Sequence, residues 1–224
     1  MAAASAGLAA EAQGVRPQAT RSGTIMKVRA MFRKAHFVEN HKQLAAVLAS
    51  VREAYRRAVF KGDPHMIAVQ NLSLFALLYN RDLSCILEDF DDPLSDYHQN
   101  LSARLAVLTI DECFAKLHGL MGKEVRAAFM AWDLSPKHAE RLAGSGKALT
   151  QVKTLHAGWI GEIRDNVIGH RDADAAAQFD LMSAIDCARV EQVAMELLSW
   201  TNELYTVLKG ALGEYLDSGQ AAKA

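Results

Sequence analysis

Residues His65 to Phe90 read HMIAVQNLSLFALLYNRDLSCILEDF, and this stretch decides the fold. Apolar side chains recur around nearly the whole circumference of the helix that it predicts, which leaves little polar face for solvent. Such a helix lies at the centre of a bundle or in an interface with a partner. Its longest apolar run contains Gln70 and Asn71 and falls short of the ~20 residues that a membrane span needs. We therefore predict a central helix and no association with a membrane.

The segments on both sides of this stretch also carry the spacing of helices. Pro64, Pro93 and Pro136 each follow an Asp or a Ser, the arrangement expected where a helix begins. Apolar residues recur every three or four positions between these prolines, and no β-hairpin signal is present. The fold class that we predict is all-α, an antiparallel helical bundle with extra N-terminal helices. The predicted helices cover residues 24–34, 44–59, 65–90, 96–120, 123–132, 147 to about 169, and a final segment after 180.

Three interruptions are predicted between these helices. The first is a break near Phe37 to Asn40, and the second is a loop at Gly144-Ser145-Gly146. The third is a connection from Arg171 to Asp180, after which Ser183 and Asp186 make a capping box for the final helix. Apolar residues at helical spacing are the predicted core positions: Leu101, Leu105, Leu108, Cys113 and Leu117 in one helix, and Val193, Leu197, Trp200, Leu204 and Leu208 in the last.

We predict four parts of the chain. The first 23 residues are rich in Ala, Gly, Ser and Gln, and they lack the basic start and apolar run of a signal peptide. The parts are a disordered tail at 1–23, an N-terminal helical segment packed on the bundle at 24–96, the helical bundle itself at 97–213, and a polar C-terminal tail at 214–224.

Charge and cysteine content limit the possible functions. The chain has 224 residues, a formal net charge of -1 and a pI of about 6.7. Because non-specific affinity for nucleic acid comes from many cationic contacts, we expect at most a small local phosphate site. Cys85, Cys113 and Cys187 lie far apart in apolar segments, which predicts reduced, buried thiols in a cytoplasmic protein. No Cys-x-x-Cys or Glu-x-x-His occurs, so we expect neither a metal site nor a cofactor.

The most polar helix end predicted from the sequence reads Arg164-Asp165-Asn166-Val167-Ile168-Gly169-His170-Arg171-Asp172. On a straight helix, Arg164 and His170 would be ~9 Å apart along the axis and ~120° apart around it, so both could not face one phosphate. Two arrangements solve this. The helix ends at Gly169 and lets His170 turn back, or two chains pair across a twofold axis and share a cleft.

These residue types suit RNA cleavage. The imidazole of His170 can take a proton from a ribose 2′-hydroxyl or give one to the leaving oxygen. The guanidinium of Arg164 can stabilise charge that develops on the phosphate. Asp165 can orient either side chain, Asn166 can favour one tautomer of His170, and Arg171 lies nearly in line with Arg164. The other interpretation is a solvated helix end without a function, in which a C-capping glycine and a favourably placed His stabilise the helix.

The segment from Arg164 to His170 resembles the Arg-x4-6-His signature of HEPN domains (higher eukaryote and prokaryote nucleotide-binding). The polar residue that follows Arg in that signature corresponds to Asp165, and the Gly-His-Arg-Asp ending is similar to that of bacterial defence and toxin–antitoxin proteins. The resemblance covers Tyr97 to Leu212. It implies a metal-independent endoribonuclease that acts on RNA as a homodimer with a composite cleft, serves as a toxin or phage-defence effector, and has an antitoxin protein as a possible partner.

The resemblance assigns Arg164, His170 and Asp165 to a catalytic set, with Asn166 and Arg171 in support. No metal and no cofactor enter this chemistry. Many HEPN proteins are inactive, so the alternative is a non-catalytic helical bundle that serves as an interaction or nucleotide-binding module.

Overall fold

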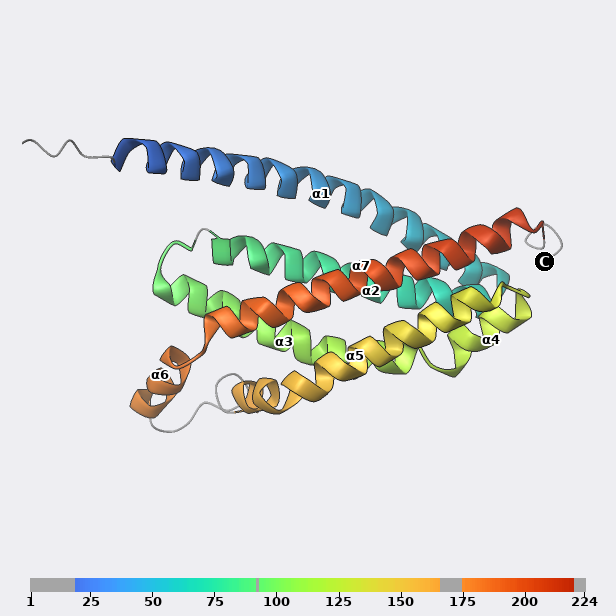
Figure 1. Ribbon diagram of the computed structural model, residues 1–224. Helices are drawn as coiled ribbons and strands as arrows, with labels where there is room; N and C mark the ends of the chain where they lie inside the picture. The colour runs from blue at the N-terminus through green and yellow to red at the C-terminus, as the bar shows by residue number, and fades with distance from the viewer. Residues whose placement is uncertain (1–18, 92, 166–174, 220–224) are drawn as a thin grey trace, which may run out of the picture. The chain divides into compact units, whose positions relative to one another are not determined.

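The computed structural model describes residues 19–91, 93–165 and 175–219, and within them the backbone forms seven α-helices and no strand (Figure 1). The predicted all-α fold class is confirmed. The chain divides into two compact units, residues 1–40 and 41–224, and the bundle belongs to the second. None of the described helices has the length and apolar character needed to cross a membrane. The helices are α1 (Ala19–Lys61), α2 (Pro64–Asp91), α3 (Asp96–Leu120), α4 (Lys123–Ala131), α5 (Pro136–Ile163), α6 (Ala175–Ser183) and α7 (Cys187–Asp217).

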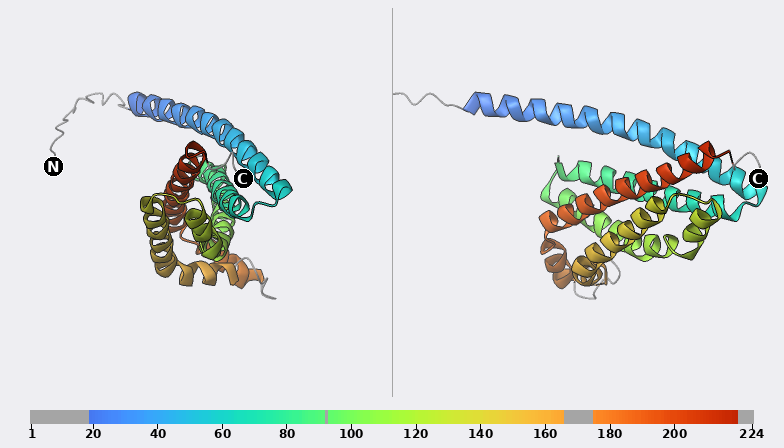
Figure 2. Two further views of the ribbon diagram at one scale, coloured as in Figure 1. Left: turned by 90° about the vertical axis from the view of Figure 1, so that its right-hand side faces the viewer. Right: turned by 45° about the vertical axis from the view of Figure 1, so that its right-hand side comes forward.

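Helix α2 lies at the centre of the bundle, as its sequence predicts. It packs against α3, α4 and α7, while α5 packs against α3 and α7 (Figures 1 and 2). Its side chains Val69, Leu72 and Leu83 are fully buried. Although α2 belongs to the predicted N-terminal segment 24–96, it therefore contributes directly to the main core. The predicted core residues of α7, from Val193 to Leu208 at helical spacing, are buried opposite it.

Polar side chains cap the N-terminal ends of α2, α3 and α7. The Asp63 carboxylate accepts hydrogen bonds from the backbone N–H groups of His65 and Met66 at the start of α2, and Ser95 Oγ accepts one from His98 at the start of α3. Asp186 alone caps α7 with its side chain, by accepting a hydrogen bond from the N–H of Arg189. The predicted capping box is wrong in its other half, because the Ser183 hydroxyl donates to the carbonyl of Phe179 within α6.

Two of the predicted interruptions are wrong. Helix α1 continues through Phe37 to Asn40. These four residues contain neither Pro nor Gly, so they interrupt the apolar pattern and leave the backbone intact. Helix α5 continues through Gly144-Ser145-Gly146. Ser145 is buried, and its carbonyl accepts a hydrogen bond of 2.8 Å from Trp200 Nε1 on α7. Packing against α7 thus outweighs the ~1 kcal/mol that each glycine costs a helix.

The predicted core face of α3 is also wrong in part. Cys113 and Leu117 are buried, but Leu101, Leu105 and Leu108 are 39%, 47% and 36% exposed. The face that packs on the bundle lies about one residue further along the helix and uses smaller side chains. Its fully buried members include Ala103, Ala106, Val107 and Ile110.

The predicted connection from 171 to 180 contains helix α6 from Ala175 onward. Asn100 and Arg104 of α3 donate hydrogen bonds to the carbonyl and the sulfur of Met182, which joins α6 to α3. Helix α7 extends into the predicted polar tail as far as Asp217, and Tyr215 is buried there. Residues 1–18 of the predicted disordered tail and 220–224 of the C-terminal tail lie outside the described residues.

Candidate functional site at the end of helix α5

Arg164 and Asp165 follow directly on α5 and continue it with a wider, π-helical turn. Arg164 keeps helical dihedral angles, with φ -56° and ψ -50°. Turns of this type place a side chain at an angle that a regular α-helix does not give, and they are frequent at functional sites. The predicted polar helix end therefore begins where the regular helix ends.

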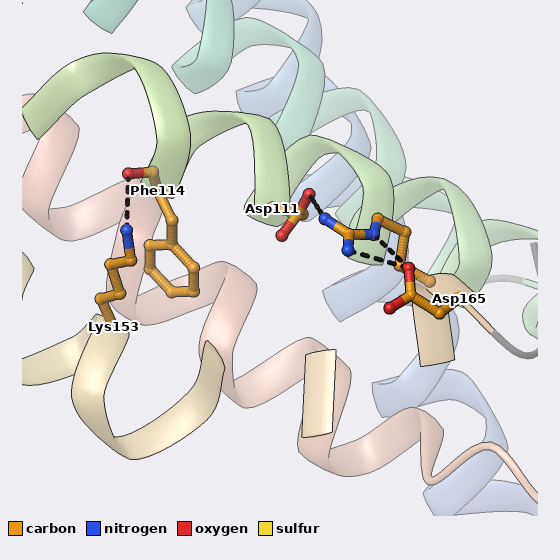
Figure 3. Close-up of polar contacts among 5 residues, drawn as sticks. Asp111, Phe114, Lys153 and Asp165 are labelled. Atoms are coloured by element: carbon orange, nitrogen blue, oxygen red, sulfur yellow. Dashed lines mark hydrogen bonds and ion pairs between the residues drawn. The ribbon is translucent and has the colours of Figure 1, made fainter. Parts of the chain in front are cut away.

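Two carboxylates hold the Arg164 guanidinium (Figure 3). Its Nη1 donates to Asp111 Oδ2 of α3 at 2.7 Å, and its Nε donates to Asp165 Oδ1 at 2.9 Å. Its Nη2 lies 2.8 Å from the same Asp165 oxygen. The contact with Asp111 ties the end of α5 to the middle of α3, so the guanidinium has a defined place although its side chain is 42% exposed.

The electrostatics of this triad keep Arg164 charged. The hydrogen bond that Arg164 donates to Asp111 is the largest cause that raises the pKa of Arg164, followed by the one that it donates to Asp165. Arginine carries five N–H donors, and the three carboxylate contacts leave two of them free for another acceptor. One positive and two negative formal charges meet here, so the triad alone does not attract an anion over a distance.

A second cation lies on the same side of α5. Lys153 Nζ donates to the carbonyl oxygen of Phe114 on α3 at 3.4 Å (Figure 3). Lys153 precedes Arg164 by eleven residues, which places the two side chains within ~20° around the helix and ~16 Å apart along it.

Of the predicted site residues, the structure brings together Arg164 and Asp165. Asn166, His170 and Arg171 lie outside the described residues. Asp111 is the member of the triad that sequence reasoning missed, since it lies 53 positions before Arg164 on another helix. A weak signal was present, because Asp111 interrupts the apolar spacing of α3 next to the fully buried Ile110 and Cys113.

A different polar cluster joins α5 to α7. Trp159 Nε1 donates to His156 Nδ1 at 3.3 Å, and His156 Nε2 lies 3.5 Å from Glu196 Oε2 of α7. The Arg189 guanidinium stacks over the Trp159 ring at 4.3 Å. Both ring nitrogens of His156 are thus engaged and its side chain is only 13% exposed. This cluster fastens α5 to α7.

The described residues give less support to a metal site or to a reactive cysteine than to a site at Arg164. Across residues 19–91, 93–165 and 175–219, no group of three or more His, Cys, Asp or Glu side chains could hold a metal ion. All three cysteines are free, but the prediction that they are buried holds fully only for Cys113. Cys85 is exposed and Cys187 is intermediate. Burial raises the pKa of Cys113 to about 12, so this thiol stays protonated.

Comparison of the chain with family models, with curated proteins and with solved structures gave no match.

Proposed function

We propose that the protein is a metal-independent endoribonuclease of the HEPN type. In this proposal Arg164 binds the scissile phosphate, Asp111 and Asp165 position Arg164, and His170 transfers protons. Asn166 and Arg171 support the site. A role as a toxin or phage-defence effector, with an antitoxin partner, belongs to the same proposal.

The observation that carries this proposal is the arrangement around Arg164. A guanidinium that binds a phosphate in a transition state needs a fixed orientation and free donors on its exposed edge. Arg164 combines both, because two carboxylates fix it and two N–H groups remain. A purely structural ion pair between α3 and α5 requires Asp111 alone. The second carboxylate restricts rotation of the guanidinium plane.

The chemistry follows from the residue types. The imidazole of His170 takes the proton of a ribose 2′-hydroxyl, whose oxygen then attacks the adjacent phosphorus. The bond from phosphorus to the 5′-oxygen breaks, which leaves a 2′,3′-cyclic phosphate, and the imidazolium of His170 gives its proton to the 5′-oxygen as that oxygen leaves. The free donors of Arg164 stabilise the negative charge that grows on the phosphate oxygens.

The test is cleavage of a labelled RNA in EDTA by the full chain and its variants. We expect Arg164→Ala to reduce the rate by about 10²–10³-fold and His170→Ala by about 10²–10⁴-fold. Asp111→Asn should reduce it less, because the amide keeps an oxygen acceptor for Nη1 but loses the charge. Arg141→Ala is the matched control, since Arg141 is an exposed arginine on the same helix.

Full cleavage by His170→Ala in a clean preparation would contradict the proposal, as would equal losses in Arg164→Ala and Arg141→Ala. Thermal unfolding of each variant separates loss of chemistry from loss of fold.

One observation favours the alternative function, an interaction module. The exposed Leu101, Leu105 and Leu108 form an apolar stripe on α3, and Asp111 lies one turn further along the helix. Residues three or four apart are neighbours on a helix surface, so the stripe is continuous with the Arg164 triad. A second copy of this chain that packs on the stripe would place two triads close together. The predicted homodimer is therefore part of our proposal.

Mass measurement by light scattering tests this self-association. Leu105→Glu should convert a dimer to a monomer, while Leu155→Glu, which changes a 71% exposed leucine on α5, should not. A wild-type chain that stays monomeric at high concentration argues against the dimer. A dimer that is unchanged after Arg164 and Arg171 are both replaced argues against a role for the motif in the interface.

A further inference from the structure

A cleft with a volume of about 970 Å³ opens between the end of α3, α4 and the first half of α5. Its floor consists of the buried apolar side chains Met121, Phe129 and Leu142, one from each of these regions. The lining of the cleft extends along α5 as far as Thr150 and Gln151. Thr150 precedes Arg164 by ~20 Å along the helix axis. The cleft is therefore separate from the candidate nuclease site.

The sequence of α5 explains why the space between α4 and α5 is hollow. Ala139, Ala143 and Gly146 line the cleft at spacings of four and three, so one face of the helix presents almost no side chain. The floor and this wall together give an apolar interior, and Met130 at the edge is 77% exposed. Methionine is flexible and polarisable, so it adapts to ligands of irregular shape.

Basic side chains dominate the rim. Arg126 comes from α4, Lys147 from α5 and His118 from the last turn of α3, and all three are exposed. Within the described parts of the chain, neither Arg126 nor Lys147 forms an ion pair. Asp133 is the one acidic residue of the lining, and it lies in the turn into α5 with a positive φ of 48°. The rim thus carries an excess of positive charge, although the net charge of the chain is -1.

We propose that this cleft binds a small amphipathic anion. The apolar body of the ligand packs on Met121, Phe129 and Leu142, and its carboxylate or phosphate head group pairs with Arg126 and Lys147. Ligand sites have this general character, with an apolar lining and a few polar groups that fix orientation. Among the residues that the structure describes, the two cations have no ion-pair partner that a ligand would have to displace.

Calorimetric titration of the full chain tests the proposal with three probes: decanoate, decyl phosphate and the neutral decanol. We expect saturable binding of the anions at one site and much weaker binding of decanol. The head group that binds more tightly distinguishes a carboxylate ligand from a phosphate ligand.

Two variants locate the site. Ala143→Trp fills the cleft from an exposed position on α5 and should abolish binding of both anions. Arg126→Gln combined with Lys147→Gln should weaken binding by about tenfold or more, since hydrogen bonds to charged groups are the stronger ones. Lys123→Gln, an exposed cation of α4 that does not line the cleft, is the matched control and should change nothing.

The proposal is overturned if neither anion binds saturably, if decanol binds as tightly, or if Lys123→Gln has the effect of the double variant. Selective binding of an acidic helical peptide in place of both anions would assign the cleft to a protein partner and also overturn it. Circular dichroism checks that each variant is folded. If Ala143→Trp does not fold, the charge variants still test the site. None of these outcomes depends on RNA cleavage.

Discussion

The buried ring of His138 determines which residue can occupy position 210 of α7. His138 is 4% exposed, and its Nε2 lies 3.0 Å from Glu214 Oε2. A β-carbon added at Gly210 would lie 3.3 Å from His138 Cε1, which is tighter than ordinary van der Waals contact. Since Glu214 holds the neighbouring ring nitrogen Nε2, movement of His138 away from position 210 would strain that hydrogen bond.

This contact predicts opposite effects for two glycines of the same helix. Gly213→Ala should stabilise the protein by about 0.5–1 kcal/mol, because a β-carbon there meets nothing within 4 Å and alanine favours the helix. Gly210→Ala should lose that gain and destabilise by about 1 kcal/mol through overpacking. Urea denaturation measures both. Equal stabilisation by the two substitutions would show that His138 yields at little cost.

The lowered pKa of Glu214 predicts that the stability of the protein depends on pH. The hydrogen bond from the Ser135 N–H, 2.6 Å long, is the largest cause that lowers the pKa of Glu214 below its ordinary value of 4.5, and His138 and Lys137 add to it. A carboxyl with a lowered folded pKa stabilises fully above pH 4.5 and loses this contribution as the pH falls further. Thermal unfolding should therefore show that Glu214→Gln destabilises near pH 7 and that its difference from wild type shrinks towards about pH 3.

The matched control for this change is Glu203→Gln, which replaces an exposed glutamate of the same helix. It should leave the unfolding temperature nearly unchanged across that range. A pH-independent loss in Glu214→Gln would mean that its effect comes from shape and not from charge.

At the same scale, the sequence predicted part of the candidate site. Arg164 and Asp165 are adjacent in the chain, so their contact is a local property that a motif can reveal. Asp111 meets Arg164 only because α3 packs on α5, and no local pattern contains that information. His170 could be selected by residue type alone, and its position relative to Arg164 stays a prediction.

The positions of the helices along the chain were easier to predict than the face of each helix that is buried. The bounds of α3 match the predicted helix 96–120, because Ser95 caps its start and a Gly follows its end. Its buried face was predicted wrongly because α3 has two apolar stripes. The leucines at 101, 105 and 108 have the larger side chains, but packing against α2 and α5 selects the smaller residues of the other stripe. Apolar spacing identifies a helix, whereas its neighbours decide which stripe is buried.

The continuity of α5 gives a prediction at the scale of the element. Gly144 is exposed within the helix, and a β-carbon there meets nothing within 4 Å. Gly144→Ala should therefore stabilise the protein by about 1 kcal/mol. Gly62→Ala is the contrasting variant, since φ is +68° at Gly62 and alanine should destabilise there by about 1 kcal/mol. A neutral Gly144→Ala in chemical denaturation would favour the predicted loop over the helix.

At the scale of the whole molecule, one core joins α2, α3, α5 and α7. The sequence predicted this bundle from the nearly all-round apolar pattern of α2, but it assigned α2 to a segment outside the bundle because the family resemblance begins only at Tyr97. Leu72 of α2 is fully buried, whereas Leu78 of the same helix is 42% exposed.

Leu72→Ala should accordingly destabilise residues 41–224 by about 2–5 kcal/mol, and Leu78→Ala by less than about 1 kcal/mol. Tryptophan fluorescence and far-ultraviolet circular dichroism should give one coincident transition for each variant. Separate transitions, with Trp132 and Trp200 unaffected by Leu72→Ala, would show that α2 folds apart from the rest.

The glycines of α5 also bear on the order in which the chain acquires its structure. This helix contains four glycines, Gly144, Gly146, Gly158 and Gly161. Its isolated segment therefore has little tendency to form a helix. We therefore expect α5 to become helical as it packs against α3 and α7, and the contact between Arg164 and Asp111 to form in that same step. An incompletely folded chain therefore has no assembled guanidinium site, and any nuclease activity would be withheld until the bundle is closed.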